Sequence, residues 1–134
     1  MRTAPLLRVA RPTRDIAAAR DFYSRALGLQ VLFVFEDHEG FDGVILGAPT
    51  WPYELEFTRD RRAPVVPTAT DEDLLVFYLP DEAEWNAAVS HLRDYGAAEV
   101  APSNPYWQRG GLTFQDADGY RVVIYRGQQI APGK

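Results

Sequence analysis

The chain has 134 residues, a formal net charge of −5 and no Cys. Its length fits one domain, and the lack of Cys excludes disulfides, thiolate nucleophiles and Cys-based metal sites. The acidic balance excludes sequence-independent binding of nucleic acid, because that binding depends on clustered cations, and the longest basic run is Arg59–Arg62.

No apolar run reaches the roughly 18 residues that a membrane helix needs. The N-terminus also lacks the hydrophobic core of a signal peptide. We therefore expect a cytoplasmic protein with no membrane partner.

The first half of the chain predicts one strand, one helix and three further strands. Leu6–Ala10 is a short apolar run that ends before Pro12, as an edge strand does. Asp15 caps a helix whose apolar residues recur at helical spacing as far as Leu27, and Gly28 closes it. The three strands that follow are Gln30–Glu36, Phe41–Leu46 and Tyr53–Phe57.

The second half repeats this order after a polar, proline-bearing linker, Arg59–Thr70. Leu74–Leu79 predicts a strand, and Asp81 caps a helix that Gly96 ends and that buries Trp85 on its apolar stripe. The chain thus divides into module one (1–58), the linker (59–70) and module two (71–134). The remaining elements are the strands Ala98–Val100, Leu112–Gln115 and Tyr120–Tyr125, with a loop at Ala101–Gly110.

A turn precedes the last of these strands. Asp116 can bond its own backbone, and Gly119 supplies the positive φ that closes the turn.

Two segments carry a family resemblance. The helix segment Phe22-Tyr-Ser-Arg-Ala-Leu-Gly28, behind its capping Asp, and the turn Asp116-Ala-Asp-Gly-Tyr-Arg resemble the vicinal oxygen chelate superfamily. That superfamily includes glyoxalase I, the bleomycin-resistance proteins and the extradiol dioxygenases, and the similarity spans essentially the whole chain. It implies an α+β fold of two βαβββ modules, each curling a mixed sheet around a cleft, commonly in a homodimer.

Enzymes of this superfamily carry metal ligands on four strands, and the resemblance places those positions at Arg8, Glu54, Leu74 and Val123. Only Glu54 is a plausible ligand, because a guanidinium has no lone pair to give and the Leu and Val side chains have no donor atom. The chain has only two His, and His38 lies in a polar turn. We therefore expect no metal site and no cofactor.

Strand alternation places Arg8, Glu54 and Glu56 on one face of module one, where we expect Arg8 to pair with Glu54. An unpaired buried charge is costly, so each needs the other, whether the pair fixes the cleft floor or contacts a ligand. Aromatic residues in turns and loops either form platforms for a planar ligand or plug the cleft or a dimer interface. The candidate ligand-binding residues are Arg8, Trp51, Glu54, Glu56, Tyr78, Tyr106, Trp107 and Arg121.

Three functions fit these residues, and the sequence identifies no catalytic residue for any of them. The favoured reading is a metal-independent protein that sequesters an amphipathic or aromatic small molecule. The second is an enzyme of the superfamily, a lyase, isomerase or dioxygenase, with an atypical active site. The third is a dimeric scaffold whose cleft is filled by its own side chains.

Overall fold

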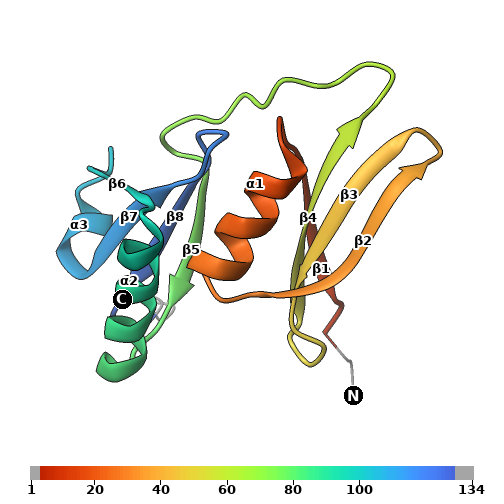
Figure 1. Ribbon diagram of the computed structural model, residues 1–134. Coiled ribbons are helices and arrows are strands. Elements are labelled where there is room, and N and C mark those ends of the chain that lie inside the picture. The colour runs from red at the N-terminus through yellow and green to blue at the C-terminus, as the bar shows by residue number, and fades with distance from the viewer. Residues whose placement is uncertain (1–3, 129–134) are drawn as a thin grey trace. The chain divides into compact units, whose positions relative to one another are not determined.

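The computed structural model describes residues 4–128, which form two compact units, one up to Thr68 and one from Ala69. Each unit contains a four-stranded mixed sheet and a helix, as Figure 1 shows. The fold class is therefore the predicted one, α+β with two βαβββ modules. Among residues 4–128, no helix is long and apolar enough to cross a membrane.

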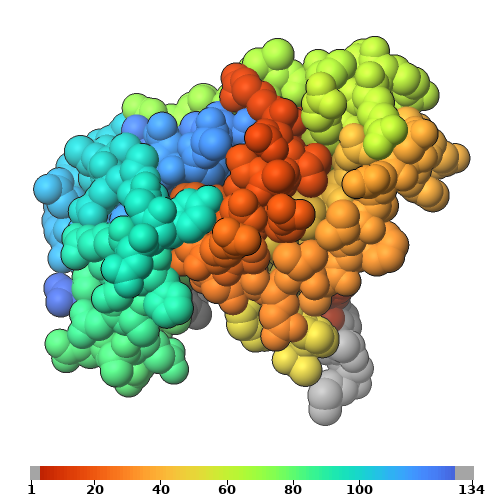
Figure 2. Space-filling view, viewed as in Figure 1, coloured from red at the N-terminus to blue at the C-terminus, as the bar shows by residue number. Residues whose placement is uncertain are grey.

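Unit one runs through β1 (Leu7–Pro12), α1 (Ile16–Asp21), η1 (Phe22–Ala26), β2 (Gln30–His38), β3 (Phe41–Gly47) and β4 (Tyr53–Asp60). Its sheet has the order β1-β4-β3-β2, with β1 parallel to β4 and the other pairs antiparallel. Tyr23 is fully buried and stacks on Phe57 of β4, with ring centroids 4.6 Å apart. The helical segment thus covers one face of the sheet, and Figure 2 shows the β2–β3 hairpin at the surface.

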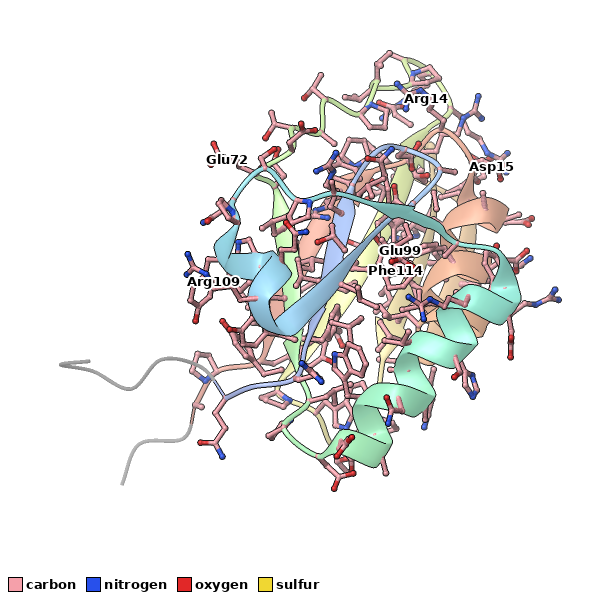
Figure 3. All side chains as sticks on the ribbon, turned by 90° about the vertical axis from the view of Figure 1, so that its left-hand side faces the viewer. Arg14, Asp15, Glu72, Glu99, Arg109 and Phe114 are labelled. Carbon is pink, nitrogen blue, oxygen red and sulfur yellow. The ribbon has the colours of Figure 1, made fainter. Side chains whose placement is uncertain are left out.

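Unit two repeats the arrangement with β5 (Leu74–Tyr78), α2 (Glu82–Tyr95), β6 (Ala98–Val100), α3 (Tyr106–Gly110), β7 (Gly111–Gln115) and β8 (Arg121–Tyr125). The sheet order is β5-β8-β7-β6, and β5 is parallel to β8. Val89 and Leu92 of α2 are buried, as are Phe114 of β7 and the neighbouring Val122 and Ile124 of β8. Phe114, labelled in Figure 3, belongs to the β7 strand of this sheet.

The first helix departs from the expected continuous helix over 16–27. It widens into a π-turn at η1, where Leu27 N donates to the carbonyl of Phe22. The wider turn places Phe22, Tyr23 and Ala26 all inside, each at most 4% exposed. An ordinary helical stripe does not predict this feature.

Two other expectations are corrected. The loop expected at Ala101–Gly110 contains α3, which begins where Asn104 Oδ1 accepts a hydrogen bond from Tyr106 N and where Pro105 has a helical φ of −60°. The strand expected to end at Phe57 continues to Asp60, because its backbone stays paired with β3 as far as Phe41.

The Asp116 turn has the geometry predicted for it. Asp116 Oδ1 accepts hydrogen bonds from Asp118 N and Tyr120 N, both at 2.9 Å. Gly119 has a φ of 95°, in the left-handed region that favours glycine. Because Asp116 is only 7% exposed, its carboxylate is a fixed part of the β7–β8 connection.

We predict that Asp116→Ala lowers the free energy of unfolding by about 2–3 kcal/mol, because one buried and one partly buried backbone N–H group lose a charged acceptor. Asp116→Asn keeps an oxygen at Oδ1, so its cost is about 1 kcal/mol. Urea unfolding measures both variants. Equal losses in the two would show that the carboxylate does not organise the turn.

Candidate functional site

A charged pair joins the first and last strands of unit one. Arg8 lies opposite Glu54 in the parallel β1–β4 register, and Arg8 Nε donates to Glu54 Oε1 at 2.7 Å. Arg8 Nη1 also lies 3.9 Å from Glu56 Oε2. The Glu54 side chain is 11% exposed and that of Arg8 is 46% exposed. The predicted pairing of Arg8 with Glu54 is confirmed, and Glu56 joins it on the same face.

These residues do not fit the metal site of the superfamily. Glu54, the one plausible ligand, already accepts a hydrogen bond from a guanidinium, which cannot coordinate a cation. In unit two, Leu74 pairs with Arg121 and Val123 pairs with Val76, so the expected positions carry aliphatic side chains. Within residues 4–128, no group of three or more His, Cys, Asp or Glu side chains could hold a metal ion.

An aromatic cluster lies at the end of the β5–β8 pair where Tyr78 is paired with Tyr125, opposite the end with Leu74 and Arg121. It consists of Tyr78, Tyr106, Trp107 and Tyr125. Tyr106 stacks on Tyr125 with an interplanar angle of 9°, and Tyr78 and Trp107 approach the same ring edge-on. Gly110 and Gly111 lie so close to Tyr125 that a Cβ on either would be within 3.1 Å of its side chain. Glycine at these positions therefore lets α3 place its aromatic residues against β8.

The phenol of Tyr106 is hydrogen-bonded to that of Tyr125. This hydrogen bond is the main reason that the pKa of Tyr106 is raised above its ordinary value, with desolvation as a smaller cause. The cluster is thus joined by a polar contact as well as by ring packing.

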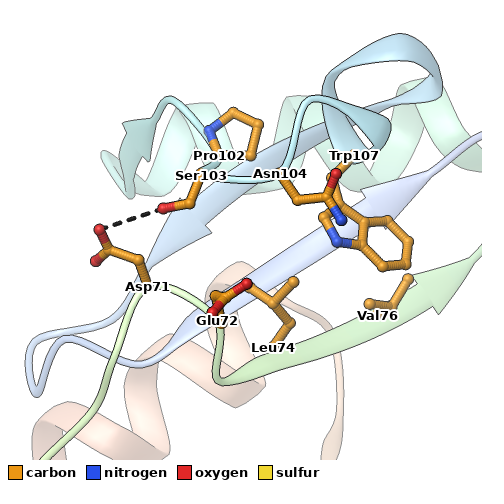
Figure 4. A pocket seen from close by; sticks show the side chains of 8 residues that line it. All are labelled: Asp71, Glu72, Leu74, Val76, Pro102, Ser103, Asn104 and Trp107. Carbon is orange, nitrogen blue, oxygen red and sulfur yellow. Dashed lines mark hydrogen bonds between the residues drawn. The ribbon is translucent and has the colours of Figure 1, made fainter.

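A pocket of about 280 Å³ opens beside the aromatic cluster. Leu74 and Val76 of β5 form one wall, and the indole of Trp107 faces them from α3 (Figure 4). Polar groups stand at the rim, including the carboxylate of Asp71, which accepts a hydrogen bond from the Ser103 hydroxyl at 3.3 Å. We call this the unit-two pocket; its lining residues are Asp71, Glu72, Leu74, Val76, Pro102, Ser103, Asn104 and Trp107.

Arg121 is held beside this pocket rather than free to meet a ligand. Its side chain lies 3.2 Å from Asp71 Oδ1 and donates to Gln115 Oε1 and to the carbonyl of Ala101. Arg121 is 9% exposed. The guanidinium therefore ties the loop before β5 and the loop after β6 to β8.

The candidate residues fall into separate groups within the two units. Arg8, Glu54 and Glu56 lie together in unit one, and Trp51 lies in the β3–β4 turn, 41% exposed and stacked on Tyr53. In unit two, Trp107 links the aromatic cluster to the pocket that Arg121 borders. Trp85, predicted to lie in the core, is only half-buried, and its indole N–H donates to the carbonyl of Ile124.

Sequence reasoning did not single out Asp71, Glu72 or Ser103 as site residues. The two acids directly follow the predicted linker, where charged residues are ordinarily solvated. For the two acids the internal repeat gave the available signal, because they lie just before β5, whose Leu74 corresponds to Arg8 of β1. No such signal pointed to Ser103.

Family models match both halves of the chain: a YycE-like N-terminal domain over residues 7–58 and a YycE-like C-terminal domain over residues 72–126. The uncharacterized protein YycE of Bacillus subtilis is 39% identical over 128 residues, which are 96% of this chain and 92% of that protein. Its crystal structure has a TM-score of 0.86, covering 98% of this chain and 95% of the other. It is described as a protein of unknown function and a candidate glyoxalase/fosfomycin resistance protein.

Two more distant structures show the fold alone. The fosfomycin resistance protein FosX of Mesorhizobium loti has a TM-score of 0.72 at 10% identity, covering 96% of this chain and 95% of its own. The trypanothione-dependent glyoxalase I of Leishmania major has a TM-score of 0.69 at 19% identity, covering 93% and 88%. The fold is therefore one that this chain shares with glyoxalase I and with fosfomycin resistance proteins.

We predict that Arg8→Met lowers the free energy of unfolding by about 1–2 kcal/mol, because Glu54 keeps a nearly buried charge without its cation. Adding Glu54→Gln should recover about 1 kcal/mol of that loss. Arg25→Met, at a largely exposed arginine of the same unit, is the control and should change little. Urea unfolding of the wild type, Arg8→Met, Glu54→Gln and the double variant measures the coupling, and strictly additive losses would contradict an energetic coupling between the two residues.

The raised pKa of Tyr106 predicts a loss of stability at alkaline pH. A group whose pKa is raised by folding contributes its full stabilisation of the folded state when the pH is below the pKa of that group in the unfolded chain, here 10.0. This contribution is lost as the pH rises through the pKa of the group in the folded protein. Tyrosine-labelled carbon NMR should therefore show a phenol that titrates above 10.0 and disappears in Tyr106→Phe. A midpoint for that phenol at or below 10.0 would contradict the hydrogen bond to Tyr125.

Proposed function

The chain belongs to the YycE-like family, and for this member we propose a metal-independent role in binding a small amphipathic or aromatic molecule. The proposed site is the unit-two pocket. One observation carries the proposal: an aromatic platform and an aliphatic wall face each other across an open space that has hydrogen-bonding groups at its rim.

The size and lining of the pocket support this proposal. A volume of about 280 Å³ is close to the lower end of the range for pockets that hold drug-sized ligands. The Trp107 indole offers a flat apolar surface, with Leu74 and Val76 opposite. Ser103 and Asn104 at the rim supply hydroxyl and amide groups that can orient a ligand.

The residues at this site favour binding over catalysis. The pocket lining contains no His, and the carboxylate of Asp71 is engaged by Arg121 and Ser103. A general base needs both reach to a substrate proton and a pKa near the working pH. Arg121, which could have stabilised a developing negative charge, is turned to structural contacts instead.

The scaffold reading keeps one observation in its favour. Tyr106, Trp107 and Tyr125 contact one another, so part of the face of unit two is covered by the chain's own rings. If the unit-two pocket takes no ligand, the self-covered face supports a scaffold rather than a binding protein.

Trp107 provides the direct test, because it is both pocket wall and fluorophore. In a Trp51→Phe/Trp85→Phe protein, Trp107 is the sole indole of the chain, and we expect planar compounds from a diverse panel to quench it saturably. Trp107→Ala should weaken the tightest of these by about tenfold in isothermal titration calorimetry, which needs no indole signal, because a central aromatic contact is lost.

The matched control is Trp107→Phe, which retains Trp51 and Trp85 and should show no saturable quenching. A panel without a single saturable quencher would favour the scaffold over the binding protein.

A further inference from the structure

A second hollow in unit two carries only positive charges among its lining residues. It has a volume of about 230 Å³ and lies where β8 ends and β7 begins, beside α2. Its ionised residues are Arg109, on α3, and Arg126, which follows β8, and Trp85 and Leu112 add apolar surface. We call it the arginine pocket. It shares no lining residue with the unit-two pocket, so the two hollows are separate.

The protein does not neutralise either arginine of this pocket. Elsewhere in the unit, Arg93 lies 3.1 Å from Glu99 Oε1, an ordinary pairing for an exposed arginine. Within residues 4–128, no ion pair joins Arg109 or Arg126 to a carboxylate. Two like charges beside one hollow repel each other, so an anion bound there lowers the energy of both.

Arg126 is held in place at the pocket. Its backbone N–H donates to the carbonyl of Gly110 at 2.7 Å, and its guanidinium carbon lies 5.2 Å from the centroid of a Trp85 ring. Trp85 is fixed in turn, because its indole N–H donates to the carbonyl of Ile124 at 2.9 Å. The cation–π contact restrains the guanidinium, which makes no hydrogen bond to the described residues. Its N–H groups are therefore available to an oxyanion.

Arg109 lies close enough to act on the same ligand. It directly precedes Gly110, which is bonded to Arg126, so the Cα atoms of the two arginines are at most about 9 Å apart. Arg109 is exposed at the outer side of α3 (Figure 3). Its long side chain can turn toward a ligand at a modest cost in rotamer entropy. Both guanidiniums can therefore reach one headgroup.

We propose that the arginine pocket binds a small organic anion, with its carboxylate or phosphate group between Arg109 and Arg126 and its apolar part beside Leu112. Guanidinium groups match the oxygens of both headgroups with paired hydrogen bonds. The net charge of −5 opposes anions at long range, but 0.1 M salt screens it beyond about 10 Å, whereas the contact with the guanidiniums is direct. This site is additional to the one proposed above and does not depend on it.

NMR titration of the full chain tests the proposal with three probes that share a benzene ring: phenyl phosphate, benzoate and the cation benzylamine. The indole N–H signal of Trp85, identified by its loss in Trp85→Phe, should shift saturably with the anions, at a Kd below about 1 mM for phenyl phosphate. Phenyl phosphate should bind more tightly than benzoate, because it carries nearly two charges at neutral pH. Benzylamine should not shift this signal, and the Trp107 signal should move little with any probe.

Arg126→Met should weaken phenyl phosphate by at least about tenfold, because it removes the restrained guanidinium. Arg126→Lys keeps the charge without the planar fork, so its affinity should lie between those of the wild type and Arg126→Met. Arg109→Met should cost about threefold, the scale of an exposed charge contact. The matched control is Arg93→Met, which removes the same charge from α2 in the same unit and should leave the affinity within about twofold.

Three results would overturn this site. The first is benzylamine binding as tightly as phenyl phosphate, and the second is equal weakening by Arg93→Met and Arg126→Met. The third is a saturable shift of the Trp107 signal in place of the Trp85 signal, which would put the anion in the unit-two pocket. Binding of only one of the two anions would support the site and identify its headgroup.

Discussion

Each unit depends on the parallel pairing of its first strand with its last. Backbone hydrogen bonds between β1 and β4 bring Arg8 beside Glu54, which lies 46 positions later in the chain. The equivalent β5–β8 pairing brings Leu74 beside Arg121. The helical connections cover one face of each sheet, so side chains from both ends of a module meet on the other face. What a module can bind therefore depends on the few residues that this register places together.

The two units use that shared geometry differently. In unit one, a guanidinium is bonded to the carboxylate that could otherwise have held a cation. In unit two, the central positions are aliphatic, and the space over them is bounded by Trp107 and the loop that precedes α3. The same fold thus supports an ion pair in one unit and an open apolar pocket in the other. This divergence illustrates why an activity follows from the side chains of a site rather than from its fold.

Local patterns predicted much of this architecture, because caps, turns and strand alternation are set by neighbouring residues. Strand alternation together with the family resemblance predicted the Arg8–Glu54 pair, and Asp116 with Gly119 predicted the last turn. The π-turn at η1 and the five-residue α3 were not predicted, because neither is long enough to show a helical period. The meeting of Val76 and Trp107 at the unit-two pocket also required the structure, since the two residues are far apart in the sequence.

The central proposal is that this chain keeps the fold of the glyoxalase and fosfomycin resistance proteins and that the unit-two pocket takes a small molecule without the usual metal. A crystal structure of protein purified without chelator, with anomalous data collected above the edges of the common transition metals, tests it most directly. The account predicts density for an organic molecule, soaked or retained, between Trp107 and Val76, and no anomalous peak near Glu54. An anomalous peak coordinated by Glu54, with Arg8 turned away from it, would contradict the account.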